Sequence, residues 1–385
     1  MNRIVVAMSG GVDSSIAALL LKEEGYEVIG VSMKLFEGSR CCTVEDVRDA
    51  KEASALGGFP HYTVNFKEVF KKEVVGYFVK GHLMGETPNP CILCNQEVKF
   101  KALLKRAREL DANLIATGHY ARVEQDSSSR RWLLKKGKDL AKDQSYFLAT
   151  LPQDILKHIR FPLGDLTKEE VREIARRKGL RFSEKEESQE LCFIPDGGYY
   201  TLIQKSVGAI HAASGEPRLR RELPLQKGEI VNNRGEVLGH HSGIVNYTIG
   251  QRRGLGISVG KPLYVTQLDP MTNRVIVGED RDLFKKDLIA RDVNWIFETP
   301  FTKGGRGIFI DPITVHVKIR SRHEGAKAIV EPLSTTGIPA CENSKVRVIF
   351  DEPQRAITPG QLVAFYDGDV VLGGGWITDA IQNSK

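Results

Sequence analysis

A string of glycine, serine and aspartate near the start of the chain has the residue types of a phosphate-binding turn. It runs from Met8 to Ser14 as Met-Ser-Gly-Gly-Val-Asp-Ser, directly after the apolar segment from Ile4 to Ala7. Glycines permit backbone angles that other residues avoid, and N–H groups at the start of a following helix attract phosphate oxygens. The carboxylate of Asp13 repels phosphates unless a cation lies between them, and Mg²⁺ on the pyrophosphate supplies one. The string therefore predicts an ATP site.

Two further strings contain cysteines that are suited to sulfur chemistry. The first, Thr87–Asn95, reads Thr-Pro-Asn-Pro-Cys-Ile-Leu-Cys-Asn and precedes a predicted helix at Asn95–Leu110. A thiol at a helix N-terminus has a lowered pKa, so we expect Cys94 to form a thiolate that attacks electrophiles or binds metal. The Cys-x-x-Cys pair also fits half of a structural zinc site, although the chain has no second pair. Cys192, in the second string at Ser188–Pro195, fits either a catalyst or a small buried apolar residue.

Composition narrows the class of protein. The chain has 385 residues, of which 41% are hydrophobic and 27% charged, and its net charge is +6 at pH 7. This length predicts two or three domains, and the mild positive charge is compatible with a polyanionic partner. No apolar stretch approaches the ~20 residues of a membrane span. A first strand predicted from about residue 3 leaves no room for a cleaved targeting peptide. We therefore expect a cytoplasmic protein. Irregular spacing of the cysteines favours reduced thiols over a disulfide framework, and the six are Cys41, Cys42, Cys91, Cys94, Cys192 and Cys341.

Over residues 1–200 the apolar segments predict an α/β fold. Buried strands and amphipathic helices alternate, which indicates a parallel sheet covered on both sides. A ligand belongs at the carboxyl ends of such strands, where the glycine string lies. The expected strands are Ile4–Met8, Val28–Met33 and Leu114–Thr117, and the expected helices are Ser14–Glu24, Thr43–Leu56, Asn95–Leu110 and Thr167–Lys178.

After about residue 200 the pattern changes. Short β-type runs between glycine-rich turns predict a small β-rich domain over residues 201–280. In residues 281–385, alternating runs at Thr314–Arg322, Lys345–Phe350 and Gln361–Tyr366 lead to an Asp-Gly turn, which predicts a small antiparallel barrel or sandwich.

The Ser-Gly-Gly-x-Asp-Ser string resembles the PP-loop of the ATP pyrophosphatases, and further strings narrow the resemblance. Over essentially its whole length the chain closely resembles the bacterial tRNA-specific 2-thiouridylase family. Besides Ser9–Ser14, the strings that carry this resemblance are Thr87–Asn95, Ala116–Ala121, Lys142–Leu148, Cys192–Ile194, His241–Gly243, Tyr247–Gly256 and Lys318–Arg320.

The resemblance implies a fold and a reaction. The fold is an α/β PP-loop adenine-nucleotide α hydrolase-like catalytic domain (1–200), a small β-rich central domain that binds tRNA (201–280) and a C-terminal β-barrel that binds tRNA (281–385). The reaction is ATP-dependent 2-thiolation of the wobble uridine, position 34, of the tRNAs for Lys, Glu and Gln. ATP with Mg²⁺ adenylates the uracil 2-carbonyl oxygen, and sulfur then displaces AMP.

The resemblance also implies roles for residues. Cys94 is the family's nucleophile, and Cys192 is its persulfide-bearing cysteine. The expected ATP-binding residues are Ala7, Met8, Ser9, Gly10, Gly11, Val12, Asp13, Ser14, Met33 and Gly118. The expected tRNA contacts are His119, Lys142, Asp143, Gln144, Arg320, Gln361 and Ser321, where the family often has an aromatic residue. His119 also fits a hydrogen-bonded histidine at a strand end, and other basic residues fit either phosphate contacts or solvated charges, namely Arg252, Arg253, Lys318, Arg320 and Arg322.

At Cys91 the chain departs from the family, in which many members carry aspartate. A third thiol thus replaces a carboxylate capable of proton transfer, and two sulfur routes follow. In one, a relay protein or cysteine desulfurase loads Cys192 as a persulfide, and Cys94 resolves the resulting bond as a disulfide. In the other, Cys91, Cys94 and Cys192 hold a [4Fe–4S] cluster whose fourth iron binds inorganic sulfide.

Two other functions stay open at this point. Another PP-loop enzyme, a synthetase or ligase of small substrates, needs neither Cys94 nor Cys192. A non-enzymatic tRNA-binding protein would use its cysteines structurally, although the intact Asp13 and Ser14 argue against it. We expect the molecule to be a monomer.

Overall fold

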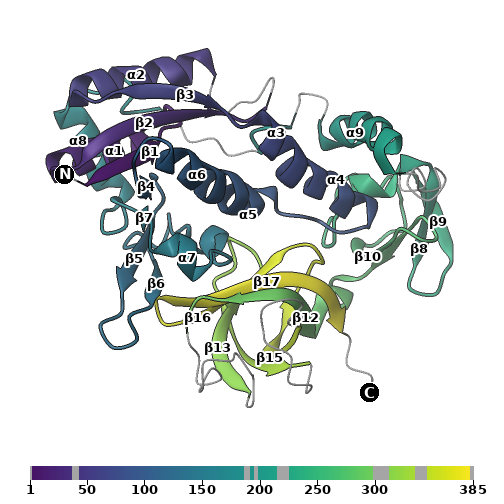
Figure 1. The fold of residues 1–385 in the computed structure, drawn as a ribbon. Helices are drawn as coiled ribbons and strands as arrows, with labels where there is room; N and C mark the ends of the chain where they lie inside the picture. Colours follow the sequence, from purple (N-terminus) through teal and green to yellow (C-terminus); the bar gives the residue numbers. More distant parts are fainter. Residues whose placement is uncertain are drawn as a thin grey trace.

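The computed structural model describes residues 2–36, 43–185, 191–194, 198–214, 225–297, 312–333 and 345–381, without the side chains of 207–214 and 381. Cys41, Cys42, Cys341, Ser188–Glu190 and Pro195 lie outside the described residues. An α/β part, a small β part and a C-terminal barrel are visible in Figure 1, with the barrel below the sheet and the small β part to the right. Among the described helices, none combines the length and the apolar character needed to cross a membrane.

A five-stranded parallel sheet forms the centre of the α/β part, in the order β3-β2-β1-β4-β7, which confirms the predicted fold class. Helices α1 (Val12–Glu23), α2 (Val44–Gly57) and α8 (Lys168–Arg177) cover one face, where Ile16 and Val171 pack with Ile4. The helical segment over residues 90–108 covers the other face, where Leu103 packs with Val5. The strands are β1 (Arg3–Ala7), β2 (Glu27–Lys34), β3 (His61–Asn65), β4 (Leu114–Ala116) and β7 (Ile159–Arg160).

Two of the predicted helix starts are confirmed by side-chain caps. The Asp46 N–H donates to the Thr43 hydroxyl at 3.2 Å, and the Thr43 N–H donates back to the Asp46 carboxylate at 2.9 Å. Thr167 and Glu170 form the same reciprocal pair at the start of α8. Each pair satisfies two backbone donors that a helix start leaves without a partner, so both starts are fixed locally.

The helix that carries the first two cysteines begins earlier than predicted. Three helical pieces follow one another, namely α5 (Pro90–Leu93), the π-helical η2 (Cys94–Ala102) and α6 (Leu103–Arg108). Asn89 is the N-cap and accepts a hydrogen bond of 3.2 Å from the Cys91 N–H, while Pro90 takes the first helical position, which proline favours. The predicted start at Asn95 is therefore wrong. A second helical segment packs beside this one and consists of α3 (Lys67–Val69), the π-helical η1 (Phe70–Val75) and α4 (Gly76–Leu83).

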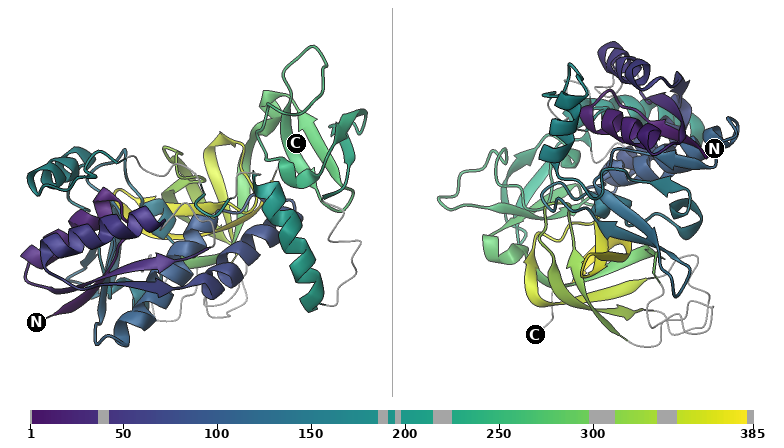
Figure 2. Two further views of the ribbon diagram at one scale, coloured as in Figure 1. Left: turned by 90° about the horizontal axis from the view of Figure 1, so that it is seen from above. Right: turned by 90° about the vertical axis from the view of Figure 1, so that its left-hand side faces the viewer.

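The small β part contains a four-stranded sheet in the order β10-β11-β8-β9, in which only the β8–β11 pairing is parallel. Helix α9 (Gly198–Ser214) precedes it in the chain. In the left view of Figure 2 the small β part lies at the opposite end of the molecule from the N-terminal helices. Its elements are β8 (Gly228–Asn232), β9 (Val237–His241), η5 (Ile244–Asn246), β10 (Tyr264–Asp269), β11 (Arg274–Gly278) and η6 (Asp280–Leu283).

Six strands close the C-terminal barrel in the order β12-β15-β14-β13-β16-β17, because β17 pairs back with β12. The structure thus selects a barrel over a sandwich. A hairpin from the α/β part, β5 (Ala121–Gln125) and β6 (Trp132–Lys136), joins the barrel sheet through β17, which the sequence did not predict. Two short helices follow that hairpin, η3 (Ser145–Leu148) and α7 (Gln153–Leu156). The barrel strands are β12 (Phe284–Trp295), β13 (Ile313–Lys318), β14 (Ala326–Pro332), β15 (Val346–Arg355), β16 (Leu362–Asp367) and β17 (Val370–Ile381).

Candidate functional site

The glycine turn after β1 is closely packed on two sides. Gly10 has a φ of +77°, and a Cβ at this position would lie 2.1 Å from the backbone oxygen of Asp46. Gly118 follows β4 and approaches the turn so closely that its Cβ would lie 2.7 Å from the backbone nitrogen of Ser14. The Ser14 hydroxyl accepts a hydrogen bond of 3.1 Å from the Ser9 N–H. Such a glycine turn at the N-terminus of α1 fits the phosphates of ATP.

An ion pair holds Asp13, the second residue of α1. The Lys168 ammonium lies 2.8 Å from each carboxylate oxygen, and the Tyr120 hydroxyl donates a hydrogen bond of 2.8 Å to one of them. Sequence reasoning gave the role of counter-ion to Mg²⁺ alone and missed Lys168. No local pattern pairs two residues that lie 155 positions apart.

A second lysine ties α2 to the same turn. The Lys185 ammonium lies 2.8 Å from an Asp46 oxygen, 2.7 Å from an Asp49 oxygen and 3.4 Å from the Gly10 carbonyl oxygen. Burial alone would raise the pKa of Asp46, but hydrogen bonds from Lys185 and Thr43 outweigh it, so the pKa is lowered. The start of α2 is therefore a charged support for the turn.

The other residues expected to bind ATP lie near the ends of β1 and β2 or at the start of α1. Ala7, Met8 and Val12 are buried at the end of β1 and the start of α1. Met33 lies on the neighbouring strand β2, and its side chain is part of the core below the sheet. Their contact with ATP stays a prediction.

The three described cysteines are thiols and form no disulfide. Burial raises the pKa of the Cys94 thiol to about 12, Lys99 opposes this rise, and the neighbouring thiols of Cys192 and Cys91 add to it. The expected thiolate at Cys94 is therefore wrong for this conformation, because the residue lies inside the helix and is only 7% exposed. Cys91, in the first helical turn, is the exposed member of the pair. Cys192 acts on both Cys94 and Cys91, which indicates that the three thiols lie in one neighbourhood.

An aromatic cluster anchors the segment that carries Cys192. The ring of Phe193 is almost fully buried and lies edge-on to Phe70 and Phe78, with both centroid distances at 5.4 Å. Phe36 completes the cluster at 6.3 Å. The backbone next to Cys192 is thus fixed, while the Cys192 side chain itself is only half-buried.

The donor arrangement does not fit a metal centre as it stands. Within the described part of the chain, no group of three or more His, Cys, Asp or Glu side chains is arranged to hold a metal ion. A [4Fe–4S] cluster needs thiolates that converge on one centre, and Cys91, Cys94 and Cys192 are neighbours without forming such a group. We therefore derive no step through a cluster.

His119, an expected tRNA contact, is buried. Its Nδ1 lies 2.6 Å from the Thr117 hydroxyl, and the rings of Phe100 and Phe161 pack against it. Burial, followed by the charge of Lys99, holds its pKa well below the ordinary value, so the imidazole is neutral. This is the hydrogen-bonded arrangement that the sequence left open, and contact with tRNA stays a prediction.

The Lys142–Gln144 segment forms part of a loop with internal hydrogen bonds. Asp143 accepts a bond of 2.9 Å from the Ser145 hydroxyl, and the Gln144 side-chain oxygen accepts one of 3.0 Å from the Tyr120 N–H. Lys142 is half-buried beside them. Because Tyr120 also donates to Asp13, this loop is two hydrogen bonds away from the glycine turn.

The expected tRNA contacts of the barrel lie in two places. Arg320 and Ser321 are exposed in the turn after β13. Gln361 instead contacts the loop before the cysteine helix, where its side-chain Nε2 donates a hydrogen bond of 2.6 Å to the Thr87 carbonyl. The Thr87 N–H donates in turn to the Pro359 carbonyl at 2.9 Å.

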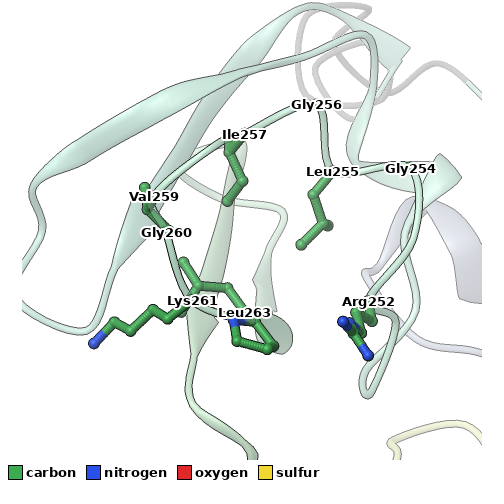
Figure 3. Close-up of a pocket in the computed structure, with 10 residues that line it drawn as sticks. Arg252, Gly254, Leu255, Gly256, Ile257, Val259, Gly260, Lys261 and Leu263 are labelled. Atoms are coloured by element: carbon green, nitrogen blue, oxygen red, sulfur yellow. The ribbon is translucent and has the colours of Figure 1, made fainter.

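The end of the Tyr247–Gly256 string, from Arg252 on, and the residues that follow it up to Leu263 line an open hollow of about 400 Å³ on the small β part (Figure 3). Arg252 and Lys261 lie at its lower edge on opposite sides, with Leu255 between them in the view. Basic groups beside apolar surface are the residue types that contact nucleic-acid phosphates and bases. The hollow is separate from the glycine turn, since its lining comes from residues 252–263 alone.

Three family models match consecutive stretches of the chain. They describe a tRNA methyl transferase HUP domain at residues 2–196, a tRNA methyl transferase PRC-barrel domain at 217–279 and an aminomethyltransferase beta-barrel domain at 285–377. A solved structure, the U34-tRNA thiolase NcsA from Methanococcus maripaludis with its [4Fe–4S] cluster, is similar over 57% of this chain and 68% of that chain. Its identity of 18% and TM-score of 0.33 are too low to bear on the site.

Two relatives match the chain over nearly its full length. The chain is 46% identical to the tRNA-specific 2-thiouridylase MnmA 1 of Caldanaerobacter subterraneus subsp. tengcongensis over 99% of both chains. It is also 46% identical to the tRNA-specific 2-thiouridylase MnmA of Geotalea uraniireducens, over 99% of this chain and 96% of the relative. The chain therefore belongs to the family of tRNA-specific 2-thiouridylases.

Proposed function

We propose that this protein catalyses ATP-dependent 2-thiolation of the wobble uridine, position 34, of the tRNAs for Lys, Glu and Gln. The names of its relatives support the substrate class. The observation that carries the proposal is the combination of a glycine turn that fits ATP with two neighbouring thiols, Cys94 and Cys192. Synthetases and ligases of small substrates need the turn but not the thiols.

Activation comes first, because the 2-carbonyl oxygen of uracil is a poor leaving group. Transfer of AMP to this oxygen releases pyrophosphate and creates a good leaving group. The N–H groups of the glycine turn and of the α1 N-terminus stabilise the phosphate charge that develops. Mg²⁺, when bound with ATP, neutralises further phosphate charge, and Asp13 is the carboxylate of the turn suited to hold it. The uridine must leave its stack in the anticodon loop to reach this site.

Sulfur transfer follows from a persulfide on Cys192. Its terminal sulfur attacks C2 of the adenylated uridine, the C2–O bond breaks, and AMP leaves with the electron pair. Cys94 then attacks the Cys192 Sγ as its proton passes to the departing 2-thiouridine, which breaks the S–S bond, leaves sulfur on the uridine and forms a Cys94–Cys192 disulfide. A thiol reductant restores both cysteines, and a relay protein or cysteine desulfurase reloads Cys192.

The test follows both half-reactions with unmodified transcripts of the three tRNAs, ATP and a persulfide donor. Mass spectrometry measures 2-thiouridine, and a coupled assay measures pyrophosphate. We expect Cys94→Ser and Cys192→Ser to lose 2-thiouridine but keep tRNA-dependent pyrophosphate release, whereas Asp13→Ala and Ser14→Ala lose both. A transcript with cytidine at position 34 is the control.

Three outcomes contradict the proposal. Normal 2-thiouridine formation by Cys94→Ser removes that cysteine from the mechanism. Pyrophosphate release that does not depend on tRNA, without 2-thiouridine, indicates a synthetase or ligase of small substrates. Binding of tRNA with neither product indicates a non-enzymatic tRNA-binding protein.

Cys91 separates the two sulfur routes. In the persulfide route it is a bystander, so Cys91→Ala should thiolate tRNA at the wild-type rate from a persulfide donor. In the cluster route it is one of three protein ligands. About four irons per chain in anaerobically prepared protein, lost together with activity in Cys91→Ala, would replace the persulfide route by the cluster route.

A further inference from the structure

We propose that Lys168 is the built-in counter-ion of Asp13 and a positioning residue for ATP. Its ammonium lies 2.8 Å from both oxygens of the Asp13 carboxylate, and the residue is 8% exposed. The inference rests on the proposed function, because it concerns the same ATP turn.

The glycine turn needs such a counter-ion. No lysine or arginine occurs between Ile4 and Leu21. Asp13 therefore brings a negative charge to the helix start at which the polyphosphate is expected. Lys185 also reaches the turn, but its ammonium is paired with Asp46 and Asp49. At a separation of a few ångströms and limited solvent exposure, two like charges repel by about 1 to 4 kcal/mol. An ammonium in direct contact with the carboxylate cancels most of that repulsion.

The fold holds Lys168 in place before any nucleotide binds. Lys168 is the first residue of α8, directly after the Thr167 cap. Its backbone N–H donates a hydrogen bond of 3.0 Å to Asp139, and its ammonium lies 5.9 Å from the centre of the Tyr120 ring. Backbone, ring and carboxylate thus define the position of the ammonium, so it requires little rearrangement when ATP arrives. A buried charge that loses its partner is left uncompensated, which makes this pair more consequential than a surface ion pair.

Binding of α,β-methylene ATP, measured by calorimetry without tRNA or sulfur donor, tests the inference. This analogue cannot be cleaved at the bond that adenylation breaks. In EDTA we expect Lys168→Met to weaken binding at least about tenfold, because the Asp13 charge now faces the phosphates. The double variant Asp13→Asn with Lys168→Met should bind within about threefold of the wild type, since both charges of the pair are gone and no carboxylate faces the phosphates. With Mg²⁺ the deficit of Lys168→Met should shrink, because the metal neutralises phosphate charge.

Lys178→Met is the matched control. Lys178 also lies at α8 and also pairs with α1, through Glu23, but at the far end of both helices. It should bind the analogue like the wild type. Melting temperatures of all variants show whether each one is folded, and the Asp13→Asn background keeps the test informative if Lys168→Met is unstable.

Two results overturn the inference. One is wild-type affinity of Lys168→Met in EDTA. The other is a double variant as weak as Lys168→Met, since the loss would then not act through Asp13. Failure of the proposed function looks different: the wild type would bind the analogue, and Lys168→Met would weaken it, while no 2-thiouridine forms.

Discussion

Gln361 has two candidate roles, contact with tRNA and support of the loop before the cysteine helix, and the two roles predict different results. The family resemblance implies that it contacts tRNA, but its side-chain Nε2 donates a hydrogen bond of 2.6 Å to the Thr87 carbonyl in the loop before the cysteine helix. We predict that Gln361 acts by positioning this loop. Gln361→Ala should therefore slow sulfur transfer and leave tRNA affinity nearly unchanged.

The expected size of the effect follows from the contacts that remain. Gln361→Ala removes one hydrogen bond between neutral groups, worth about 1 kcal/mol net, which corresponds to about a fivefold lower population of the correctly placed loop. The bond of 2.9 Å from the Thr87 N–H to the Pro359 carbonyl persists. Gly360 also stays packed against Glu86, where its Cβ would lie 2.8 Å from the Glu86 Cβ. The loss should thus be partial.

Single-turnover formation of 2-thiouridine at saturating tRNA measures the transfer rate, and filter binding measures the dissociation constant for tRNA. We expect a rate about fivefold lower, a dissociation constant within about twofold of the wild type, and unchanged pyrophosphate release. Gln354→Ala is the control, because Gln354 bonds within the barrel, to the Glu352 carbonyl at 2.7 Å. A fivefold weaker affinity with an unchanged rate would refute the positioning role.

Three further predictions concern the turn and the thiols. Gly118→Ala should weaken ATP-analogue binding by at least about tenfold, because its Cβ would lie 2.7 Å from the backbone of Asp13 and Ser14, whereas Gly76→Ala meets only an ordinary contact at 3.6 Å and should be neutral. Phe193→Ala should cost up to about 3–5 kcal/mol of stability. It should abolish thiolation while tRNA-dependent pyrophosphate release persists. Unchanged thiolation would show that the aromatic cluster around Phe193 is not needed to position Cys192. Iodoacetamide should alkylate Cys91 before Cys94, because Cys91 is exposed and Cys94 buried. Burial raises the pKa of both thiols, that of Cys94 to about 12, so the Cys94 rate should rise as the pH approaches 12. Equal rates at pH 8, measured by peptide mass spectrometry, would contradict the burial of Cys94.

Features with local causes were predictable from the sequence. The caps at Thr43 and Thr167 depend on residues three positions apart, and the parallel sheet follows from the alternation of apolar strands and helices. The start of the cysteine helix was equally local, since Asn89-Pro90 is an N-cap followed by a proline at the first helical position. The predicted start at Asn95 followed the apolar periodicity alone, and that periodicity begins only after the first helical turn.

Contacts between distant segments were not predictable in this way. The pairing of Asp13 with Lys168 and the bond between Gln361 and Thr87 each join residues more than a hundred positions apart, and no spacing rule links them. The same holds for the raised pKa of Cys94, which depends on what the fold packs around it rather than on its position along a helix. Sequence reasoning thus identified residue types suited to the chemistry, while their protonation states and partners depended on tertiary structure.

The barrel contributes to the geometry of the α/β part through several of these distant contacts. Strand β6 pairs with β17, and Arg122 at the base of the hairpin forms an ion pair of 2.7 Å with Asp369. The Tyr146 hydroxyl donates to the Leu362 carbonyl at 2.8 Å, directly after the Lys142–Gln144 segment. The same edge of the barrel holds Thr87 ahead of the cysteine helix. The loop before the cysteine helix and the Lys142–Gln144 loop are thus held by the same barrel edge. A displacement of that edge would move the two loops together, and the thiols would shift together with the expected tRNA contacts.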